Sequence, residues 1–318
     1  MTSPSPGPHS DRSDGPYHTI ERPRTRRPRP GRAVISTFTD KLLEISRRND
    51  SLLCVGLDVD PSRAPVSLGR DPGWIERFNR GIVEATSDLV CAYKPNLAFY
   101  EALGAEGWDG LRTTLAAIPP EIPVIADGKR GDIGSTSEAY ARALFEELGV
   151  DATTLTPYVG LDGLEPFLRH RERGLLILCK TSNPGSGDFQ DLPVQWQGTQ
   201  MPLYEVVARR VIEWSGQRNG QCGLVVGATY PSQLRDIRAL TPNLPILIPG
   251  IGAQSGSLEE AVRFGTDRRG ELGIVNVGRT ILYASTGADW QEAARREALR
   301  TVEAMRQARV AIGQAGPA

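Results

Sequence analysis

The stretch Asp127-Gly128-Lys129-Arg130-Gly131-Asp132-Ile133-Gly134 directly follows a short apolar run, residues 122–126. A run of this length, rich in β-branched residues, predicts a buried strand. Because side chains alternate along a strand, Asp127 and Lys129 are expected to point to the same side. The glycines let the backbone turn, which keeps Asp132 within reach. The stretch therefore predicts an ammonium group among carboxylates at the end of a strand, a crowding of charge that is costly to bury.

Length and composition are those of an ordinary globular protein. The chain has 318 residues, of which 39% are hydrophobic and 24% charged, enough for two domains or one large α/β barrel. A formal net charge of -1 gives no reason to expect a nucleic-acid or membrane partner. There is no apolar run long enough to span a bilayer, and the first thirty residues lack the apolar core of a secretory signal.

The cysteines and histidines do not have the spacing of a metal site. The four cysteines lie far apart in apolar runs, which predicts buried free thiols in a reducing compartment, by default the cytoplasm. Two of the three histidines, His9 and His18, fall in the N-terminal tail, and His170 lies in a charged run and is expected to be solvated. We therefore expect neither a metal ion nor a Ser-His-Asp nucleophile.

The N-terminal residues 1–33 differ in composition from the rest. They contain seven prolines and seven arginines with few large apolar side chains, which predicts a disordered tail. A transit peptide or basic docking arm is the alternative, although the prolines disfavour an amphipathic helix. The remaining residues, 34–318, are expected to form one domain.

Short β-rich apolar runs alternate with amphipathic segments along this domain. The eight predicted strands are 52–57, 89–93, 122–126, 152–156, 175–179, 223–226, 246–248 and 274–277. The predicted helices are 36–45, 75–84, 110–117, 137–147, 203–215, 232–239, 258–264 and a closing helix, 291–309. This alternation predicts an α/β fold, a single (β/α)₈ TIM barrel. A doubly wound open sheet is the alternative, but the chain has no glycine-rich dinucleotide turn and no Walker-type loop.

Polar residues collect at the carboxyl ends of these strands, where barrels place their functional side chains. They are Asp58, Lys94, Asp127, Lys129, Thr156, 180–183, 249–254, Gly278 and Arg279. Such a set at the ends of apolar strands predicts a site. For Asp127 and Lys129 alone, a solvated ion-pair cluster on a surface loop would be the simpler interpretation.

Several of these positions allow more than one role. Asp58 could bind sugar hydroxyls or cap the next helix. Lys94 lies in an apolar strand and needs an anionic partner, so it could belong to the site or to a structural ion pair. The glycines of 249–254 and 278–279, together with Arg279, predict a phosphate site rather than plain turns. The polar segment from Ser182 to Met201 predicts a lid, with a surface insertion as the alternative.

The sequence resembles the orotidine 5'-phosphate decarboxylase family, in its longer bacterial-type (type 2) subgroup. The resemblance extends over about residues 36–310, and the run Asp-Gly-Lys-Arg-Gly-Asp-Ile-Gly-Ser-Thr at 127–136 is its most specific part. The other matching motifs are Gly56-Leu57-Asp58, Tyr93-Lys94-Pro95-Asn96, Ala98-Phe99-Tyr100-Glu101, Pro157-Tyr158, 181–185, 249–254 and 277–279.

The resemblance implies conversion of orotidine 5'-phosphate to UMP and carbon dioxide, the last step of UMP synthesis, without a cofactor. It implies that Lys129 donates the proton and that Asp127 lies beside the leaving carboxylate. Asp132 would reach into the partner's site, so a homodimer with shared sites is implied. The other implied site residues are Lys94 and Asp58 in the charge and ribose network, Ile133 and Thr136 crossing with Asp132, Ser182 at the pyrimidine, and Gln254, Gly278 and Arg279 at the phosphate.

The implied chemistry requires charge from the protein. Loss of carbon dioxide leaves an electron pair in the ring plane, where the π system cannot delocalise it, so an ammonium group held in a dry cavity would have to stabilise it. One alternative is a related barrel enzyme, a sugar-phosphate decarboxylase or aldolase, using the same scaffold with magnesium. Another is a catalytically silent sensor of nucleotide phosphates that docks through its arginine-rich tail.

Overall fold

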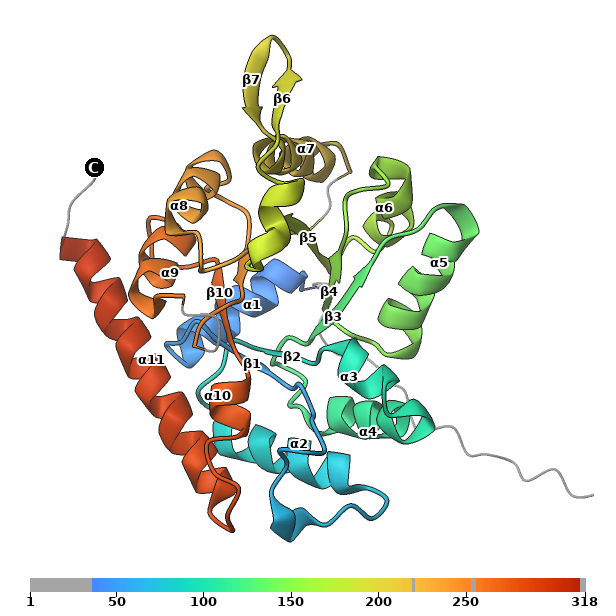
Figure 1. The fold of residues 1–318 in the computed structure, drawn as a ribbon, viewed down its shortest axis with the longest axis vertical. Coiled ribbons are helices and arrows are strands. Elements are labelled where there is room, and N and C mark those ends of the chain that lie inside the picture. Colours follow the sequence, from blue (N-terminus) through green and yellow to red (C-terminus); the bar gives the residue numbers. More distant parts are fainter. Residues whose placement is uncertain (1–35, 219–220, 253–255, 315–318) are drawn as a thin grey trace, which may run out of the picture.

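The eight predicted strands form one parallel sheet that curls into a barrel surrounded by helices (Figure 1). The computed structural model describes residues 36–218, 221–252 and 256–314, so the predicted tail, 1–33, lies outside the described residues. The strands are β1 (Leu53–Gly56), β2 (Ala92–Lys94), β3 (Ile125–Arg130), β4 (Ala152–Leu155), β5 (Gly174–Lys180), β8 (Gln221–Val226), β9 (Ile246–Ile248) and β10 (Gly273–Val277). The prediction of a (β/α)₈ barrel is confirmed.

The order of the strands follows the chain around the barrel. Paired neighbours run β2-β1-β10-β9-β8-β5-β4-β3, and every pair is parallel. β2 and β3 complete the circle through two isolated bridges, in which Tyr93 N–H donates to Pro123 O (3.0 Å) and Asp127 N–H donates to Pro95 O (2.9 Å). The carboxyl ends of all eight strands therefore open on one end of the barrel, which brings the polar strand ends together.

Helices cover the outside of the barrel and connect consecutive strands. They are α2 (Trp74–Thr86), α3 (Leu97–Glu101), α4 (Gly104–Ala117), α5 (Gly134–Arg142) with the π-helical turn Ala143–Glu147, α6 (Leu161–Leu168), α7 (Leu203–Arg218), α8 (Pro231–Leu240), α9 (Leu258–Gly265), α10 (Arg279–Leu282) and α11 (Trp290–Gln314). None of the helices within the described ranges is long and apolar enough to cross a membrane.

The amino-terminal helix α1 (Phe38–Arg48) packs at the opposite end of the barrel from the polar strand ends. Thr37 and Asp40 form a reciprocal capping box that starts this helix. The ring of Phe38 packs directly on Gly174 at the start of β5, where a Cβ atom would come within 2.4 Å of the ring. This close fit of an aromatic ring on a glycine seals the amino ends of the strands.

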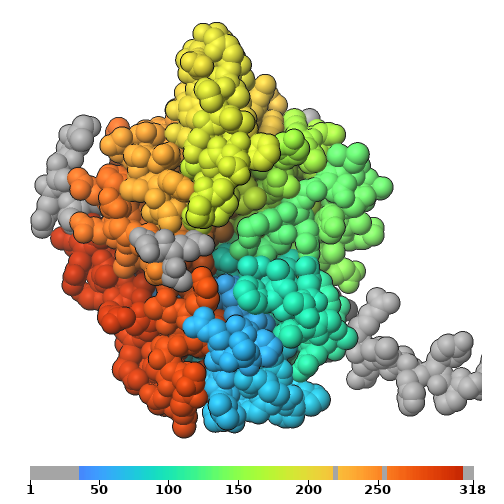
Figure 2. Space-filling model, viewed as in Figure 1, coloured from blue at the N-terminus to red at the C-terminus, as the bar shows by residue number. Residues whose placement is uncertain are grey.

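The segment between β5 and α7 departs from the plain loop expected there. It begins with the 3₁₀ turn Pro184–Asp188 and continues as an antiparallel hairpin, β6 (Pro193–Trp196) and β7 (Thr199–Pro202). The hairpin protrudes beyond the body of the molecule in the space-filling view (Figure 2).

The prediction that the four cysteines are buried free thiols is confirmed. Cys54, Cys91, Cys179 and Cys222 are all buried and unpaired.

Candidate active site

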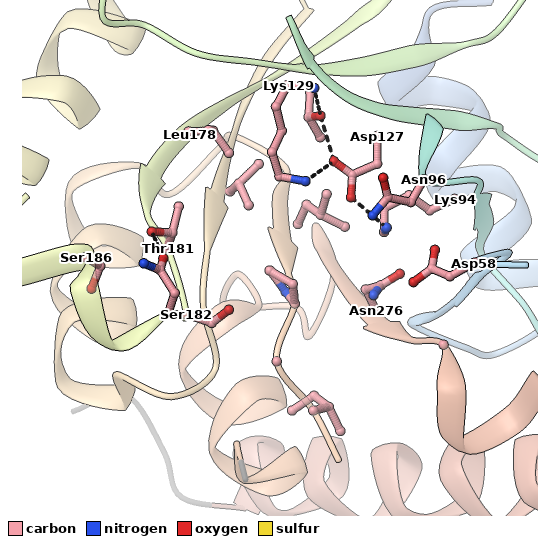
Figure 3. A pocket seen from close by; sticks show the side chains of 18 of the residues that line it. Asp58, Lys94, Asn96, Asp127, Lys129, Leu178, Thr181, Ser182, Ser186 and Asn276 are labelled. Carbon is pink, nitrogen blue, oxygen red and sulfur yellow. Dashed lines mark hydrogen bonds and ion pairs between the residues drawn. The ribbon is translucent and has the colours of Figure 1, made fainter. Parts of the chain in front are cut away.

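A cavity of about 550 Å³ lies at the carboxyl ends of the strands. Figure 3 shows Asp127, Lys94 and Lys129 on one side of it, with Thr181, Ser182 and Ser186 across from them. Its lining contains the following residues predicted for the site from the sequence: Asp58, Lys94, Asp127, Lys129, Ser182, Gly278 and Arg279. The structure thus brings together residues from the ends of five strands, β1, β2, β3, β5 and β10.

Asp127 is held between two ammonium groups. Its Oδ2 accepts a hydrogen bond from Lys94 Nζ at 2.8 Å and its Oδ1 accepts one from Lys129 Nζ at 2.6 Å. Burial alone would raise the pKa of Asp127, but the charges of Lys94 and Lys129 outweigh burial and hold that pKa well below its usual range. Asp127 is therefore ionised at neutral pH.

Lys94 supplies a buried charge to this network. Its side chain is only 4% exposed, because β2 directs it into the barrel beneath Asp127. Burial alone would lower the pKa of Lys94, but Asp127 and Asp58 raise it above its ordinary value. The anionic partner that the sequence requires for Lys94 is thus Asp127, and Asp58 adds to the stabilisation of its charge.

The backbone at Lys129 is strained. Its φ is +46°, in the left-handed region that side chains other than glycine rarely adopt, and the pairing of β3 with β4 shifts register between Ala126 and Arg130. Thr154 on β4 supports this conformation, because its hydroxyl oxygen accepts from Lys129 N–H (2.9 Å) and its O–H donates to Asp127 Oδ1 (2.9 Å). Lys129 and Asp127 meet as predicted, but through this bend rather than through regular strand alternation.

The expectation of a dry cavity is not met in the single chain. The Lys129 side chain is 49% exposed, whereas that of Asp127 is 10% exposed. The ammonium of Lys129 thus lies at the boundary between the buried network and open water. Further atoms would have to cover this side before the charge was shielded from solvent.

Asp58 and Asn276 lie next to each other at the ends of β1 and β10 (Figure 3). One carboxylate oxygen of Asp58 and the amide oxygen of Asn276 are buried without a hydrogen-bond partner. Burial raises the pKa of Asp58, although the charge of Lys94 opposes this effect. Both residues line the cavity, and oxygens that lack a donor are suited to accept hydrogen bonds from hydroxyl groups.

The residues predicted to bind phosphate follow β9 and β10. Pro249, Gly250, Gly278 and Arg279 line the same cavity, whereas Gln254 lies outside the described residues. A Cβ atom at Gly278 would lie 3.5 Å from Asp58 Oδ2, an ordinary van der Waals contact, so Gly278 directly neighbours this carboxylate. An arginine guanidinium beside exposed backbone is a common arrangement for gripping phosphate oxygens.

Three predicted site residues do not line the cavity of their own chain. They are Asp132, Ile133 and Thr136, which belong to the turn after β3 and the first turn of α5. Ile133 is 59% exposed, although it is a large apolar side chain. Asp132 Oδ1 accepts from Ile133 N–H at 2.8 Å, which fixes the turn and leaves this short segment facing outward.

Other cavity residues had no role assigned from the sequence. Thr154 and Asn276 are each the last residue but one of their strands, β4 and β10, and both line the cavity. Asn96 caps α3 through its side-chain oxygen and also lines the cavity. A threonine or asparagine inside an apolar strand is the sequence signal that could have identified the first two.

Metal ligands are not grouped in this site. In the ranges that the structure describes, there is no cluster of three histidine, cysteine, aspartate or glutamate side chains that could hold a metal ion. The two oxygens of Asp127 already accept hydrogen bonds from ammonium groups. A cation bound at Asp127 would be repelled by these two ammonium groups.

Comparison with known proteins gives consistent results. Residues 51–296 match the model of the orotidine 5'-phosphate decarboxylase / HUMPS family. Orotidine 5'-phosphate decarboxylase of Herpetosiphon aurantiacus is 51% identical over 262 residues, which cover 82% of this chain and 95% of the relative. The enzyme of that name from Thermomicrobium roseum is 52% identical over 281 residues, covering 88% of this chain and 99% of the relative.

Two solved structures from Leishmania donovani have a fold similar to that of this chain. Leishmania donovani OMP decarboxylase is 38% identical with a TM-score of 0.74, covering 86% of this chain and 99% of that one. Leishmania donovani UMP synthase is 41% identical with a TM-score of 0.74, covering 85% of this chain. The chain spans 57% of the length of that UMP synthase.

Proposed function

Because this chain belongs to the orotidine 5'-phosphate decarboxylase / HUMPS family and is a carboxy-lyase of that family, we propose that it decarboxylates orotidine 5'-phosphate to UMP using only its own charged side chains. The observation that carries this proposal is the position of Asp127 between Lys94 and Lys129, at one wall of a cavity that Arg279 also lines. The hydrogen bonds between them fix the carboxylate and both ammonium groups relative to one another.

Lys129 is proposed to act as the proton donor. When the bond between the ring and the carboxylate breaks, carbon dioxide leaves and the electron pair stays on the pyrimidine carbon. The ammonium of Lys129 stabilises this charge and transfers a proton to that carbon, which gives UMP. The contacts of Lys129 with Asp127 Oδ1 and Thr154 support this role, because they fix the amine before the reaction begins.

Asp127 is proposed to lie beside the leaving carboxylate. Its low pKa keeps it charged, so it orients the amine of Lys129 and repels the carboxylate of the bound substrate. Lys94 neutralises part of the charge of Asp127 from the buried side. The hydrogen bond from Lys94 Nζ to Asp127 Oδ2 (2.8 Å) makes Lys94 a positioning residue for this carboxylate. Removal of either lysine would leave a buried carboxylate insufficiently paired.

The remaining cavity residues are proposed to bind the rest of the nucleotide. Asp58, with Asn276 beside it, would accept hydrogen bonds from the ribose hydroxyls. Ser182 would contact the pyrimidine amide, and Gly278, Arg279 and Gln254 would bind the phosphate. Contacts with these non-reacting parts supply binding energy that can be used at the reacting carbon.

We further propose that two chains share each active site. Asp132, Ile133 and Thr136 face away from the cavity of their own chain, and the exposed Ile133 is suited to pack on a second copy. A second chain at this place would also cover the exposed side of Lys129.

A cytoplasmic location is proposed as well, since four buried free thiols suit a reducing compartment.

Substitution of Asp58 by asparagine is expected to stabilise the free protein and to weaken UMP binding. Because burial raises the pKa of Asp58, its charged form destabilises the fold above the pKa of an unfolded aspartate, about 4. At pH 7 we expect Asp58→Asn to raise Tm by about 2 °C, and at pH 4 to give a smaller gain because more of the wild-type carboxyl is then protonated. Calorimetry at both pH values measures the gain.

The same samples give the affinity for UMP, which we expect to fall about tenfold or more because a ribose contact is lost. Asp60→Asn is the matched control. Hydrogen bonds from Ser62 lower the pKa of Asp60, so this substitution should not raise Tm. A lower Tm for Asp58→Asn at pH 7 would contradict the conclusion that the buried charge of Asp58 destabilises the fold.

Turnover of orotidine 5'-phosphate, with and without excess EDTA, tests the proposed function. The expected result is formation of UMP at a rate that the chelator does not change. Loss of activity in EDTA would favour the related magnesium-dependent barrel enzyme acting on a sugar phosphate. Absence of turnover in either buffer, with UMP still bound, would favour a nucleotide-phosphate sensor.

A further inference from the structure

Lys180 carries a second buried ammonium group, separate from the network around Asp127. It is the last residue of β5, and its side chain is completely buried. The pairing of β5 with β8 shifts register between Leu178 and Lys180, and Leu178 lines the cavity whereas Lys180 does not. A charge buried in this way requires close partners, and none of the roles proposed above uses it.

The partners of Lys180 come from the segment that immediately follows it and from the start of α8. Its Nζ donates to both carboxylate oxygens of Asp191, each at 2.8 Å, and to Ser186 Oγ at 3.0 Å. The ring of Tyr230 covers the ammonium at 4.3 Å, and the Tyr230 hydroxyl donates to Asn183 O at 3.3 Å. The ammonium thus joins the middle of this segment, at Ser186, and its far end, at Asp191, to the end of β5.

The segment 181–192 forms one wall of the cavity. The cavity residues that it contributes are Thr181, Ser182, Asn183, Gly185, Ser186, Phe189 and Gln190. Ser186 is shared, because its hydroxyl contacts the ammonium while the residue also lines the cavity. Two hydrogen bonds join Gln190 to Thr181: Thr181 N–H donates to Gln190 Oε1 (2.9 Å), and Gln190 Nε2 donates to the Thr181 hydroxyl (2.8 Å).

We propose that Lys180 is a positioning residue that sets nucleotide affinity without touching the nucleotide. Its ion pair with Asp191 holds the segment 181–192 folded back over the end of β5, so that Ser182 and its neighbours face the cavity. Without the ion pair, this wall samples other conformations, and the nucleotide must restore the folded one when it binds. The inference rests on the proposed function for the identity of the nucleotide.

The test uses Lys180→Met, Asp191→Asn and the double variant. Methionine preserves the length and volume of the lysine stem, and Asp191 is 45% exposed, so its substitution leaves the packing intact. For each single variant we expect the KM for orotidine 5'-phosphate and the Kd for UMP to rise about tenfold, with kcat within about threefold of wild type. The double variant should be no weaker than Lys180→Met, because both changes remove the same ion pair.

Asp88→Asn is the matched control for a loss of stability alone. Asp88 forms a two-point ion pair with Arg295 at 2.7 and 2.8 Å, far from the segment 181–192 in the chain. This variant should lower Tm without changing KM. If Lys180→Met and Asp191→Asn also change only Tm, the proposal is overturned, and it is supported if Asp191→Glu restores part of the affinity that Asp191→Asn loses.

Amide hydrogen exchange in the ligand-free protein separates this proposal from the proposed function. In Asp191→Asn, amides of 181–192 should exchange faster, including those of Ser186 and Gln190, which donate to Asn183 O and Ser186 O. Unchanged exchange in this segment would overturn the inference whatever the substrate. Faster exchange in a protein that does not turn over orotidine 5'-phosphate would support the positioning role and contradict the proposed function.

Discussion

The variant Lys129→Ala is expected to lose at least about 10⁴-fold in kcat while binding UMP with nearly wild-type affinity. The loss is large because one ammonium group is proposed to provide both the proton and the charge that stabilises the electron pair. Binding is preserved because Arg279 and Asp58 lie elsewhere in the cavity and do not depend on this amine. Single-turnover kinetics with saturating orotidine 5'-phosphate, and calorimetric titration with UMP, measure the two effects.

Lys41→Ala provides a control that also removes an ion-paired lysine. Lys41 Nζ donates to Asp151 Oδ1 at 2.6 Å, but this pair lies at the amino ends of the strands, away from the cavity. It should therefore lower stability without changing kcat. Retention of activity in Lys129→Ala within about tenfold of wild type would refute the proton-donor role.

Mixing two inactive proteins, Lys129→Ala and Asp132→Ala, is expected to restore activity to about one quarter of the wild-type value. Each variant alone is inactive because every site lacks one of the two residues. Random exchange makes half of the dimers mixed, and in each mixed dimer one site combines the intact Lys129 of one chain with the intact Asp132 of the other. The rate after mixing is compared with that of the separate proteins, and labelled chains verify the exchange.

A chain that carries both substitutions gives the matched control. This chain is exchanged with an equal amount of wild type, so that half of the dimers are mixed. If sites are shared, no mixed dimer contains an intact site, and activity falls to about one quarter of that of wild type alone. If each chain formed its own site, activity would fall only to about one half. Asp132 itself tolerates the change, since its side chain accepts one local hydrogen bond from Ile133 N–H. No recovery on mixing, with exchange demonstrated, would count against a shared site.

The barrel was predictable because parallel strands that are buried on both sides leave continuous apolar runs in the sequence. All eight runs overlap with strands of the sheet, although the runs 89–93 and 122–126 begin before β2 and β3, and the spaces between the runs leave room for the connecting helices. The helix α6 gave a weak signal because it has eight residues and contains Pro166. The hairpin of β6 and β7 was missed because each strand has only four residues, which are exposed or partly exposed, so the conformation depends on the pairing of the two strands with each other.

The site was predictable to the extent that its side chains stand at strand ends. Asp58, Lys94, Asp127 and Arg279 were placed by topology alone, because a parallel barrel brings such positions to one rim. The left-handed backbone of Lys129 was not predictable, since it depends on a hydrogen bond from its N–H to Thr154 on another strand. The partly exposed state of its side chain likewise depends on what covers the cavity, which one chain cannot determine.

Exchange of deuterium from D₂O into UMP, at the ring carbon that carried the carboxylate, tests the role of Lys129 most directly. Protonation of this carbon is reversible in principle, so the group that delivers the proton must also remove it. NMR of UMP incubated with the protein should detect exchange with wild type and none above background with Lys129→Ala, at concentrations that saturate both. Equal exchange rates in the two proteins would contradict the account, because another group would then carry the proton.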